Sequence, residues 1–371
     1  MAVGFSGSNE GISRESAHKI FKYELLRLRA SPRWVAKLLQ LPLEISYFVN
    51  NECQLSCRHC YVGPKETEGS LSVGEWQEVF AECLRLGART FGAVGKEPLL
   101  VWDKTLALLR WFKEQKETQQ PLDLMLRYGL VTNGIALDER KIADLAEVSP
   151  TYVDISFDGT KPLHDHLRGQ GMYDRVFSNV AKFPDELKQR VFISFTANRV
   201  NNGSLSALVD ELYSIGIRNF LISPYVSTRV GVNENWPDLV DDDATIALYA
   251  QRLLGGEQVD WRKYTHLRIY FKTDYTTSRG VMDELVLRGI INPGEMLIDE
   301  YGTIFNRYVF GSNEVYFNFI PFDDTLIRSV RIGHDGFVSG CHAMFFGDER
   351  YRSLASGNVR ETLIGTILDS A

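Results

Sequence analysis

The stretch ISYFVNNECQLSCRHCY, residues 45–61, joins an apolar run to a loop rich in cysteine. The run ISYFV (45–49) predicts a buried strand. Three of the chain's five cysteines, Cys53, Cys57 and Cys60, follow this strand and lie together in a stretch of eight residues. The cysteine loop is therefore expected at the carboxyl end of the first strand of the fold.

The same order, a short apolar run and then an amphipathic helix, recurs after the cysteine loop. Six strands alternating with helices predict βα units and a parallel sheet, and right-handed crossovers curl such a sheet towards a barrel. Six units are fewer than the eight of a closed barrel, so the sequence predicts an incomplete, TIM-like (β/α)6 barrel of the α/β class. Functional side chains are then expected at the carboxyl ends of the strands. The predicted strands are 45–49, 90–94, 126–132, 152–158, 191–197 and 219–225, and the helices are 70–87, 105–115, 138–148, 173–183 and 204–216.

The regions on either side of this pattern differ from it. Residues 1–44 predict an N-terminal helical extension, and residues 45–230 form the predicted partial barrel. Residues 231–371 predict a smaller α+β C-terminal extension that could cap the open side of the barrel. Its predicted elements are a helix at 240–254, strands at 266–272, 314–320 and 326–332, and a hairpin turn at Asp335-Gly336.

The composition is that of a well-packed protein, with 371 residues, 44% of them hydrophobic, and a net charge of −7. No strongly basic region suggests a nucleic-acid footprint. No apolar run approaches the ~20 residues of a membrane span, and the N-terminus lacks the features of a secretory signal. We therefore expect a soluble, cytoplasmic protein that binds neither nucleic acid nor membrane. Thiols stay reduced in the cytosol, where clustered cysteines more often bind metal or perform chemistry than form disulfides.

Three cysteines in one polar loop allow several interpretations. Core cysteines are ruled out by the polarity of the loop. A zinc site would need His59 as fourth ligand, and His59 is adjacent to Cys60, which disfavours convergence on one tetrahedral ion. A redox disulfide would use Cys57 and Cys60 and leave Cys53 unexplained. An iron–sulfur cluster uses all three thiolates, and the missing fourth ligand leaves one iron open to a small molecule.

The spacing C-x3-C-x2-C, with His59 in the position of an aromatic residue, resembles the signature of the radical S-adenosylmethionine (SAM) enzymes. The resemblance covers about residues 45–225. It implies one [4Fe–4S] cluster on Cys53, Cys57 and Cys60, with SAM at the open iron. It also implies that one electron from a flavodoxin or ferredoxin splits SAM, and that the resulting 5′-deoxyadenosyl radical abstracts a hydrogen atom from a substrate C–H bond.

Further segments after the predicted strands resemble SAM-binding motifs of this family. VGKEPLL (94–100) resembles the Gly-Gly-Glu-Pro segment that binds the SAM amino group, with Lys96 in place of the second glycine. A lysine disfavours the positive φ that glycine tolerates. HDHLRG (164–169) resembles a segment of peptide-modifying members, and its arginine suits a bidentate grip on a carboxylate. The resemblance implies the following cofactor-binding residues: Tyr61 at the adenine, Gly95, Lys96, Glu97 and Pro98 at the amino group, Thr132 and Asn133 in a family turn, Ser156 and Asp158 at the ribose and carboxylate, and Arg168 as a carboxylate partner.

The C-terminal region resembles the SPASM or twitch extension of the family, at its opening hairpin (332–341) and at its closing helix (357–368). It holds one cysteine, Cys341, which is too few for auxiliary clusters. Without such an electron acceptor, redox-neutral outcomes such as epimerisation or rearrangement are favoured. Cys341 is then a candidate hydrogen-atom donor, or else an inert former ligand. Cys83 lies on the apolar stripe of the helix 70–87 and is expected in the core.

The SPASM-like tail and the HDHLRG segment favour natural-product tailoring, on a ribosomal peptide or a sugar. Oxidative cross-linking or maturation of a peptide is the alternative reaction. A non-catalytic iron–sulfur or SAM-binding protein is the alternative of another class.

Overall fold

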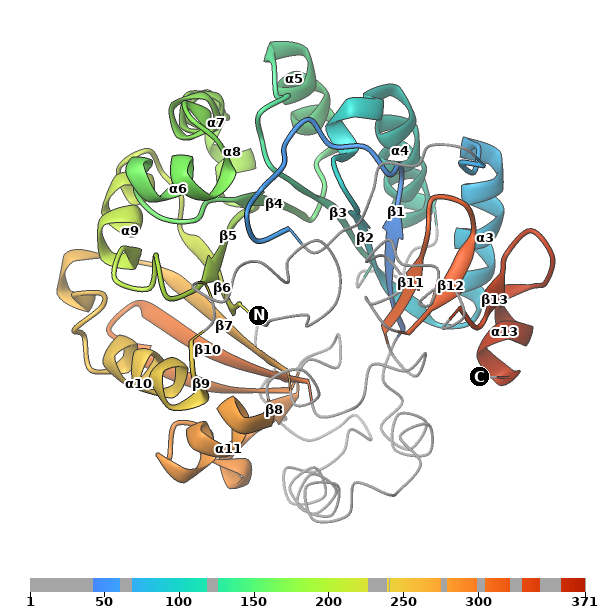
Figure 1. Cartoon of the computed structure of the whole chain (residues 1–371). Coiled ribbons are helices and arrows are strands. Elements are labelled where there is room, and N and C mark those ends of the chain that lie inside the picture. Colours follow the sequence, from blue (N-terminus) through green and yellow to red (C-terminus); the bar gives the residue numbers. More distant parts are fainter. Residues whose placement is uncertain are drawn as a thin grey trace.

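The computed structural model describes residues 43–60, 69–118, 126–225, 239, 241–274, 279–298, 304–320, 329–340 and 355–370 (Figure 1). Residues 1–42 lie outside these ranges, so the N-terminal helical extension stays a prediction. Among the described residues, no helix combines the length and the apolar character needed to cross a membrane.

The described strands form one 13-stranded sheet in the order β13-β12-β11-β1-β2-β3-β4-β5-β6-β7-β10-β9-β8. The sheet curves, and the helices that follow β2 to β6 cover its outer face (Figure 1). All neighbours from β11 through β1–β7 to β10 are parallel. The first six strands, which the sequence predicted, are β1 (Leu43–Phe48), β2 (Ala88–Val94), β3 (Arg127–Thr132), β4 (Tyr152–Ser156), β5 (Val191–Ala197) and β6 (Asn219–Pro224). The predicted partial barrel is confirmed.

The predicted helices are also present, and several elements were not predicted. The predicted helices are α3 (Val73–Arg85), α4 (Trp102–Thr118), α5 (Glu139–Val148), α7 (Met172–Ala181), α9 (Leu205–Ser214) and α10 (Asp243–Leu254). The unpredicted elements are α6 (Lys161–Arg168), α8 (Asp185–Lys188), α11 (Arg279–Leu287), the 3-10 helices η1 (Pro98–Val101), η3 (Trp261–Lys263) and η4 (Pro293–Glu295), and the strands β8 (Leu297–Ile298) and β9 (Ile304–Phe310).

The helix α3 shows how local sequence fixes an element and its buried face. Ser72 and Glu75 form a capping box, in which each side chain accepts a hydrogen bond from the other residue's amide. One turn further, Trp76 and Phe80 pack on Tyr47 of β1, with ring centroids 5.4 and 4.7 Å from the Tyr47 ring. Burying one such side chain stabilises the fold by about 2–3 kcal/mol. Tyr47 thus faces the helices, and Phe48 faces the inside of the barrel because strand side chains alternate.

Two glycines make room for a tyrosine on the inner face of the sheet. Gly92 of β2 and Gly129 of β3 are neighbours in register, and Gly129 is also paired with Tyr152 of β4. A Cβ at Gly92 would lie 2.6 Å from the Tyr152 hydroxyl, and one at Gly129 would lie 2.2 Å from the Tyr152 carbonyl oxygen. The Tyr152 ring therefore lies across β3 and β2 inside the barrel, towards the amino ends of the strands.

The C-terminal third adds strands to both edges of the six-stranded core. β7 (Arg268–Asp274) and β10 (Asn313–Ile320) continue the sheet beyond β6, while β11 (Ser329–Ile332), β12 (Phe337–Ser339) and β13 (Gly357–Asn358) continue it beyond β1. The predicted hairpin is confirmed, because β11 and β12 pair antiparallel around Gly336, whose φ is 90°. The predicted closing helix (357–368) is only partly present, because residues 357–358 pair with β12 as β13 and the helix α13 spans Ile364–Ser370. This helix contacts α3, since Glu82 accepts hydrogen bonds from the amides of Ile364 and Gly365. A domain boundary at residue 230 stays a prediction.

Candidate active site

The three cysteines lie directly after β1, as the sequence predicts, and all three are half-buried. The Cys60 amide donates to the Cys57 carbonyl over 3.1 Å, and the Arg58 amide donates to the Leu167 carbonyl of α6 over 2.9 Å. The Asn133 amide nitrogen Nδ2, after β3, donates to Cys53 Sγ over 3.7 Å. The cysteine loop is thus held between the carboxyl ends of β3 and β4.

Positive charge faces the thiol of Cys57. Arg168 Nη1 of α6 lies 3.9 Å from Cys57 Sγ. Burial raises the pKa of Cys57 to about 11, and the Arg168 guanidinium opposes that rise, whereas Cys60, Asp158 and Cys53 add to it. A bound metal would deprotonate the thiol outright, and the guanidinium would then stabilise the thiolate.

These residues fit an iron–sulfur cluster by the chemistry of their donor set. Three thiols in one loop supply the ligands that clusters use, and hydrogen bonds to sulfur, such as that from Asn133, tune such sites. Among the described residues, no three His, Cys, Asp or Glu side chains converge as they would around one metal ion. A cluster places each thiolate on a separate iron, so its ligands need not converge on a point.

Glu97 is buried at the carboxyl end of β2 and joins it to β3. Its Oε1 accepts hydrogen bonds from Thr132 Oγ1 (2.6 Å) and the Leu99 amide (3.0 Å), and its Oε2 accepts one from the Asn133 amide (2.9 Å). Burial raises the pKa of Glu97, and the bonds from Thr132, Asn133 and Leu99 oppose the rise. Asn50 Nδ2, just after β1, donates to the Glu97 carbonyl over 3.0 Å. The predicted site residues Glu97, Thr132 and Asn133 are therefore brought together.

The turn before Glu97 has Gly95 and Lys96 where the Gly-Gly-Glu-Pro segment of the family has two glycines. Gly95 has a φ of 114°, and a Cβ there would lie 3.0 Å from the Phe48 ring, so glycine is required. In the described part of the chain, the non-glycine residues with a positive φ are Ser149 and His266, so Lys96 does not have this conformation. Lys96 therefore stands in this turn without backbone strain. Pro98, also predicted, is the first residue of η1 and is buried.

Asp158 is the second residue after β4. It is fully buried and forms an ion pair with Arg168. His59 Nε2 lies 3.3 Å from Asp158 Oδ2, and the Thr196 amide of β5 donates to Asp158 Oδ1 over 3.1 Å. Burial would raise the pKa of Asp158, but Arg168, His59 and His164 outweigh it, so the pKa is lowered. Burial lowers the pKa of His59 to about 4, so its ring is neutral at pH 7. The predicted carboxylate partner Arg168 thus already holds a carboxylate of this chain.

The remaining predicted residues divide between described and undescribed parts. Ser156, the last residue of β4, is half-buried and paired in register with Ser194 of β5. Tyr61 and Cys341 lie outside the described residues. Cys83 on α3 is 1% exposed, as expected of a core cysteine.

Sequence reasoning missed Asn50, His164 and Thr196. Asn50 is buried, and its Oδ1 has no hydrogen-bond partner among the described residues. Its signal was its place directly after β1. His164 Nδ1 lies 3.3 Å from the Asp158 amide, on the unpredicted helix α6. Thr196 acts through its backbone, which carries no sequence signal.

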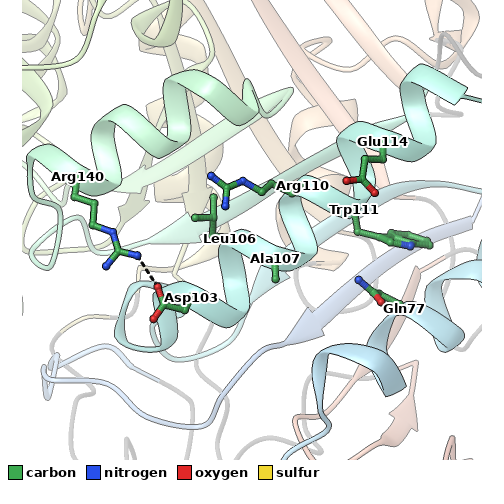
Figure 2. A pocket seen from close by; sticks show the side chains of 8 residues that line it. All are labelled: Gln77, Asp103, Leu106, Ala107, Arg110, Trp111, Glu114 and Arg140. Atoms are coloured by element: carbon green, nitrogen blue, oxygen red, sulfur yellow. Dashed lines mark hydrogen bonds and ion pairs between the residues drawn. The ribbon is translucent and has the colours of Figure 1, made fainter.

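A groove of about 330 Å³ lies elsewhere, on the outer helices (Figure 2). Gln77 of α3, Trp111 of α4 and Arg140 of α5 are among its lining residues. Arg140 forms an ion pair with Asp103, and Arg110 forms one with Glu147. The groove is on the helical side of the sheet, whereas the cysteines follow a strand, so it is not part of this site.

A partial parallel barrel with a three-cysteine loop after its first strand is the arrangement that the resemblance to the radical SAM enzymes predicts. Residues 47–211 match the family model of the radical SAM superfamily. The chain therefore carries a radical SAM domain, and the predicted family is confirmed.

Known proteins resemble the chain over this domain and beyond it. It is 27% identical over 210 residues to the Fe-coproporphyrin III synthase of Methanosarcina barkeri, covering 54% of this chain and 50% of that protein. It is 23% identical over 237 residues to the PqqA peptide cyclase of Rhodopseudomonas palustris, covering 61% and 60%. The matched parts thus span 50% and 60% of the lengths of these two relatives. The structure of Streptococcus suis SuiB bound to precursor peptide SuiA shares the fold, with a TM-score of 0.64 and 16% identity over 100% of this chain and 72% of that chain.

Proposed function

We propose that this chain is a radical SAM enzyme that removes a hydrogen atom from a C–H bond of a peptide. The observation that carries the proposal is the cluster of thiols after β1 beside the buried Glu97 after β2. When bound, a [4Fe–4S] cluster and SAM supply the electron and the 5′-deoxyadenosyl group that takes the hydrogen atom. A flavodoxin or ferredoxin is the proposed electron donor.

The protein's part is to bind and orient. Cys53, Cys57 and Cys60 would hold the cluster, and Arg168 would balance its negative charge. A carboxylate has about four acceptor positions, and three are used in Glu97, so one remains for the SAM amino group.

The other predicted SAM contacts belong to the same proposal. Gly95, Lys96 and Pro98 would shape the turn around the amino group, and Thr132 and Asn133 would fix Glu97. The half-buried Ser156 would meet the ribose, and the Tyr61 backbone would meet the adenine. Asp158, which accepts from Arg168 and from the Thr196 amide, would orient Arg168 at the SAM carboxylate.

The proposed substrate class draws on the relatives. The PqqA peptide cyclase is named for a peptide substrate, and the segment 164–169 resembles one found in peptide-modifying members. A redox-neutral outcome, epimerisation or rearrangement, is favoured because Cys341 is the one cysteine of the C-terminal third. Cys341 is then the proposed donor of the returning hydrogen atom.

The test is anaerobic reconstitution with iron and sulfide, followed by reduction with dithionite in the presence of SAM. About four irons per chain and formation of 5′-deoxyadenosine are expected. Both should be lost in Cys57→Ala. An iron-loaded protein that forms no 5′-deoxyadenosine would refute the proposal. Deuterium uptake from D2O into a peptide product, dependent on Cys341, would support epimerisation.

A further inference from the structure

Asp154, in the middle of β4, is a buried carboxylate on the inner face of the barrel. It is 8% exposed, and its Oδ1 has no hydrogen-bond partner among the described residues. Its neighbours in sequence, Val153 and Ile155, belong to the hydrophobic core, so Asp154 and Ser156 share the opposite, inner face. A buried acceptor without a donor is destabilising, and native proteins rarely leave one unless it serves a function.

We propose that Asp154 binds the substrate, by accepting a hydrogen bond from a backbone N–H of a peptide inside the barrel. This inference rests on the proposed function and adds a residue to its substrate site. Asp154 is not among the residues that the family resemblance assigns to SAM.

The depth of Asp154 in the barrel supports this role. It lies two residues before Ser156, the proposed ribose contact, which is roughly 6.6 Å along a strand. Two residues further down, Tyr152 fills the inner face through the space left by Gly92 and Gly129. Asp154 thus faces the layer between the proposed SAM position and the Tyr152 ring, which is where a substrate has to meet the 5′ carbon.

The surrounding inner face suits a peptide. Tyr270 of β7 packs against Phe192 of β5 at 5.4 Å and stacks on Tyr316 of β10 at 4.8 Å, which gives an aromatic wall for an apolar side chain. Lys272, two residues after Tyr270 on the same face, is exposed and close enough to act on the charge of Asp154. An acceptor at Asp154 and a donor at Lys272 match the N–H and C=O of a peptide backbone.

The electrostatics keep Asp154 able to accept. Burial raises its pKa to about 6, and the Ser194 hydroxyl, Lys272 and Arg168 oppose the rise. The side chain is therefore mostly ionised at pH 7.5, where a carboxylate only accepts hydrogen bonds. Because Lys272 and Arg168 already balance its charge, a neutral N–H is a better partner than a third cation.

The experiment uses the reconstituted full chain with SAM, dithionite and a peptide pool made by digesting a perdeuterated protein. Hydrogen abstraction from a peptide breaks a C–D bond and leaves deuterium in 5′-deoxyadenosine, which mass spectrometry detects. The readout is the deuterated fraction of the 5′-deoxyadenosine formed. A purely structural defect lowers the total product, whereas loss of substrate binding lowers the deuterated fraction.

In Asp154→Asn the deuterated fraction should fall at least tenfold relative to the wild type. Asp103→Asn, the same change on the outer face of α4, should retain the wild-type fraction. Lys272→Met, at an exposed position that does not threaten folding, should also lower the fraction. An unchanged fraction in both Asp154→Asn and Lys272→Met would overturn the proposal.

Two further outcomes separate this proposal from the proposed function. Unlabelled 5′-deoxyadenosine from the wild type would overturn peptide binding at Asp154 and leave SAM cleavage standing. Absence of 5′-deoxyadenosine from an iron-loaded wild type would overturn both.

Discussion

Glu97 shows how one side chain connects three strand ends. Its carboxylate takes donors from Thr132, Asn133 and Leu99, and its carbonyl takes one from Asn50. This residue is completely buried, so each bond replaces one that water would have made. The ends of β1, β2 and β3 are thereby fixed in one geometry before any ligand binds, which lowers the entropic cost of binding.

Glu97→Gln should weaken both SAM binding and stability. The substitution replaces one carboxylate oxygen, which accepts hydrogen bonds, by an NH2 group, which cannot. At least one of the three donors then stays unsatisfied, which lowers the unfolding free energy by about 1–3 kcal/mol. We expect SAM affinity, measured by equilibrium dialysis on iron-loaded protein, to fall at least tenfold, which is about 1.4 kcal/mol. Glu114→Gln on the outside of α4 serves as the control. Wild-type affinity in Glu97→Gln would contradict the assigned role.

Cys57 and Cys83 provide a matched pair of serine substitutions. Cys57→Ser should lose most of its iron, because a hydroxyl is a poor replacement for a cluster thiolate. Cys83→Ser should keep its iron and lose about 1–3 kcal/mol of stability, because it places a hydroxyl in the core where the thiol is 1% exposed. Iron per chain and urea unfolding measure the two effects. Iron loss from Cys83→Ser at wild-type stability would contradict this division.

Asp154 should make stability depend on pH. Burial raises its pKa from 3.8 to about 6, so the folded protein holds the proton more tightly than the unfolded chain. This contribution is complete below pH 4 and is lost as the pH rises through 6, a change of about 2–3 kcal/mol. Lys272, Arg168, Tyr152 and Ser194 face this group.

Urea unfolding at pH 5 and at pH 7.5 measures the effect. We expect the stability of Asp154→Asn to change less with pH than that of the wild type. Relative to the wild type, the variant should gain stability mainly at pH 7.5. Parallel pH profiles for the two proteins would show that Asp154 does not titrate in this range.

At the scale of elements, the packing of β2, β3 and β4 depends on glycines, which have no side chain to collide with Tyr152. Gly129→Ala would place a Cβ 2.2 Å from the Tyr152 carbonyl, which is backbone and cannot rotate away. We expect a loss of about 1–3 kcal/mol by chemical denaturation. Gly74→Ala on the exposed side of α3, where no atom lies within 4 Å, should gain up to about 1 kcal/mol instead. Equal effects of the two substitutions would argue against the inner-face packing.

The elements that the sequence predicted well share one property. Runs such as VFISFTA, which became β5 without change, are apolar, short and bounded by polar turns. The helix α6 was not predicted because HDHLRG is mostly polar. Its buried residues His164 and Asp165 are paired with the backbone amides of Asp158, before the helix, and Tyr173, in the next helix. The strand β9 was not predicted because the buried polar residue Asn306 interrupts its apolar pattern. Its two hydrogen bonds to the backbone of Asn292 cannot be read from the local sequence.

Most of the site was predictable because its residues lie at the carboxyl ends of predicted strands, although Asn50, after β1, was missed. Cys53, Glu97, Thr132 and Asp158 all lie at or just beyond these ends, because parallel strands bring their carboxyl ends to one edge. The pairing of Arg168 with Asp158 could not be derived, because it depends on the direction in which α6 returns over the sheet. Lys96 was expected to conflict with a glycine conformation, but only Gly95 needs a positive φ in that turn.

At the scale of the whole molecule, one sheet joins the predicted partial barrel to the predicted C-terminal extension, as far as the structure describes them. β11, from the C-terminal third, pairs with β1 through four residues, from Glu44–Ser329 to Tyr47–Ile332. At the other edge, β7 pairs with β6 from Asn219–Arg268 to Ile222–Phe271. Both edges of the six-stranded core are therefore covered by strands of the C-terminal third. β11, more than 200 residues after β1 in sequence, covers the β1 edge, and β7 covers the β6 edge. Exposed strand edges favour aggregation, so this cover has a protective role.

This continuity predicts that the chain unfolds as one cooperative unit. Calorimetry of the full chain should give a single transition whose calorimetric and van't Hoff enthalpies agree. A chain ending at residue 225 loses the partners of both β1 and β6, and the core cluster loses Ile269, Phe271, Val330 and Ile332, each fully buried. Burial of one such side chain stabilises the fold by about 1.5–3 kcal/mol. Losing four of them would therefore remove most of a typical unfolding free energy of about 5–15 kcal/mol. The truncated chain should therefore lack a cooperative transition. Two separate transitions in the full chain, or a truncated chain that melts at the full-length temperature, would instead establish an independent domain ending near residue 230.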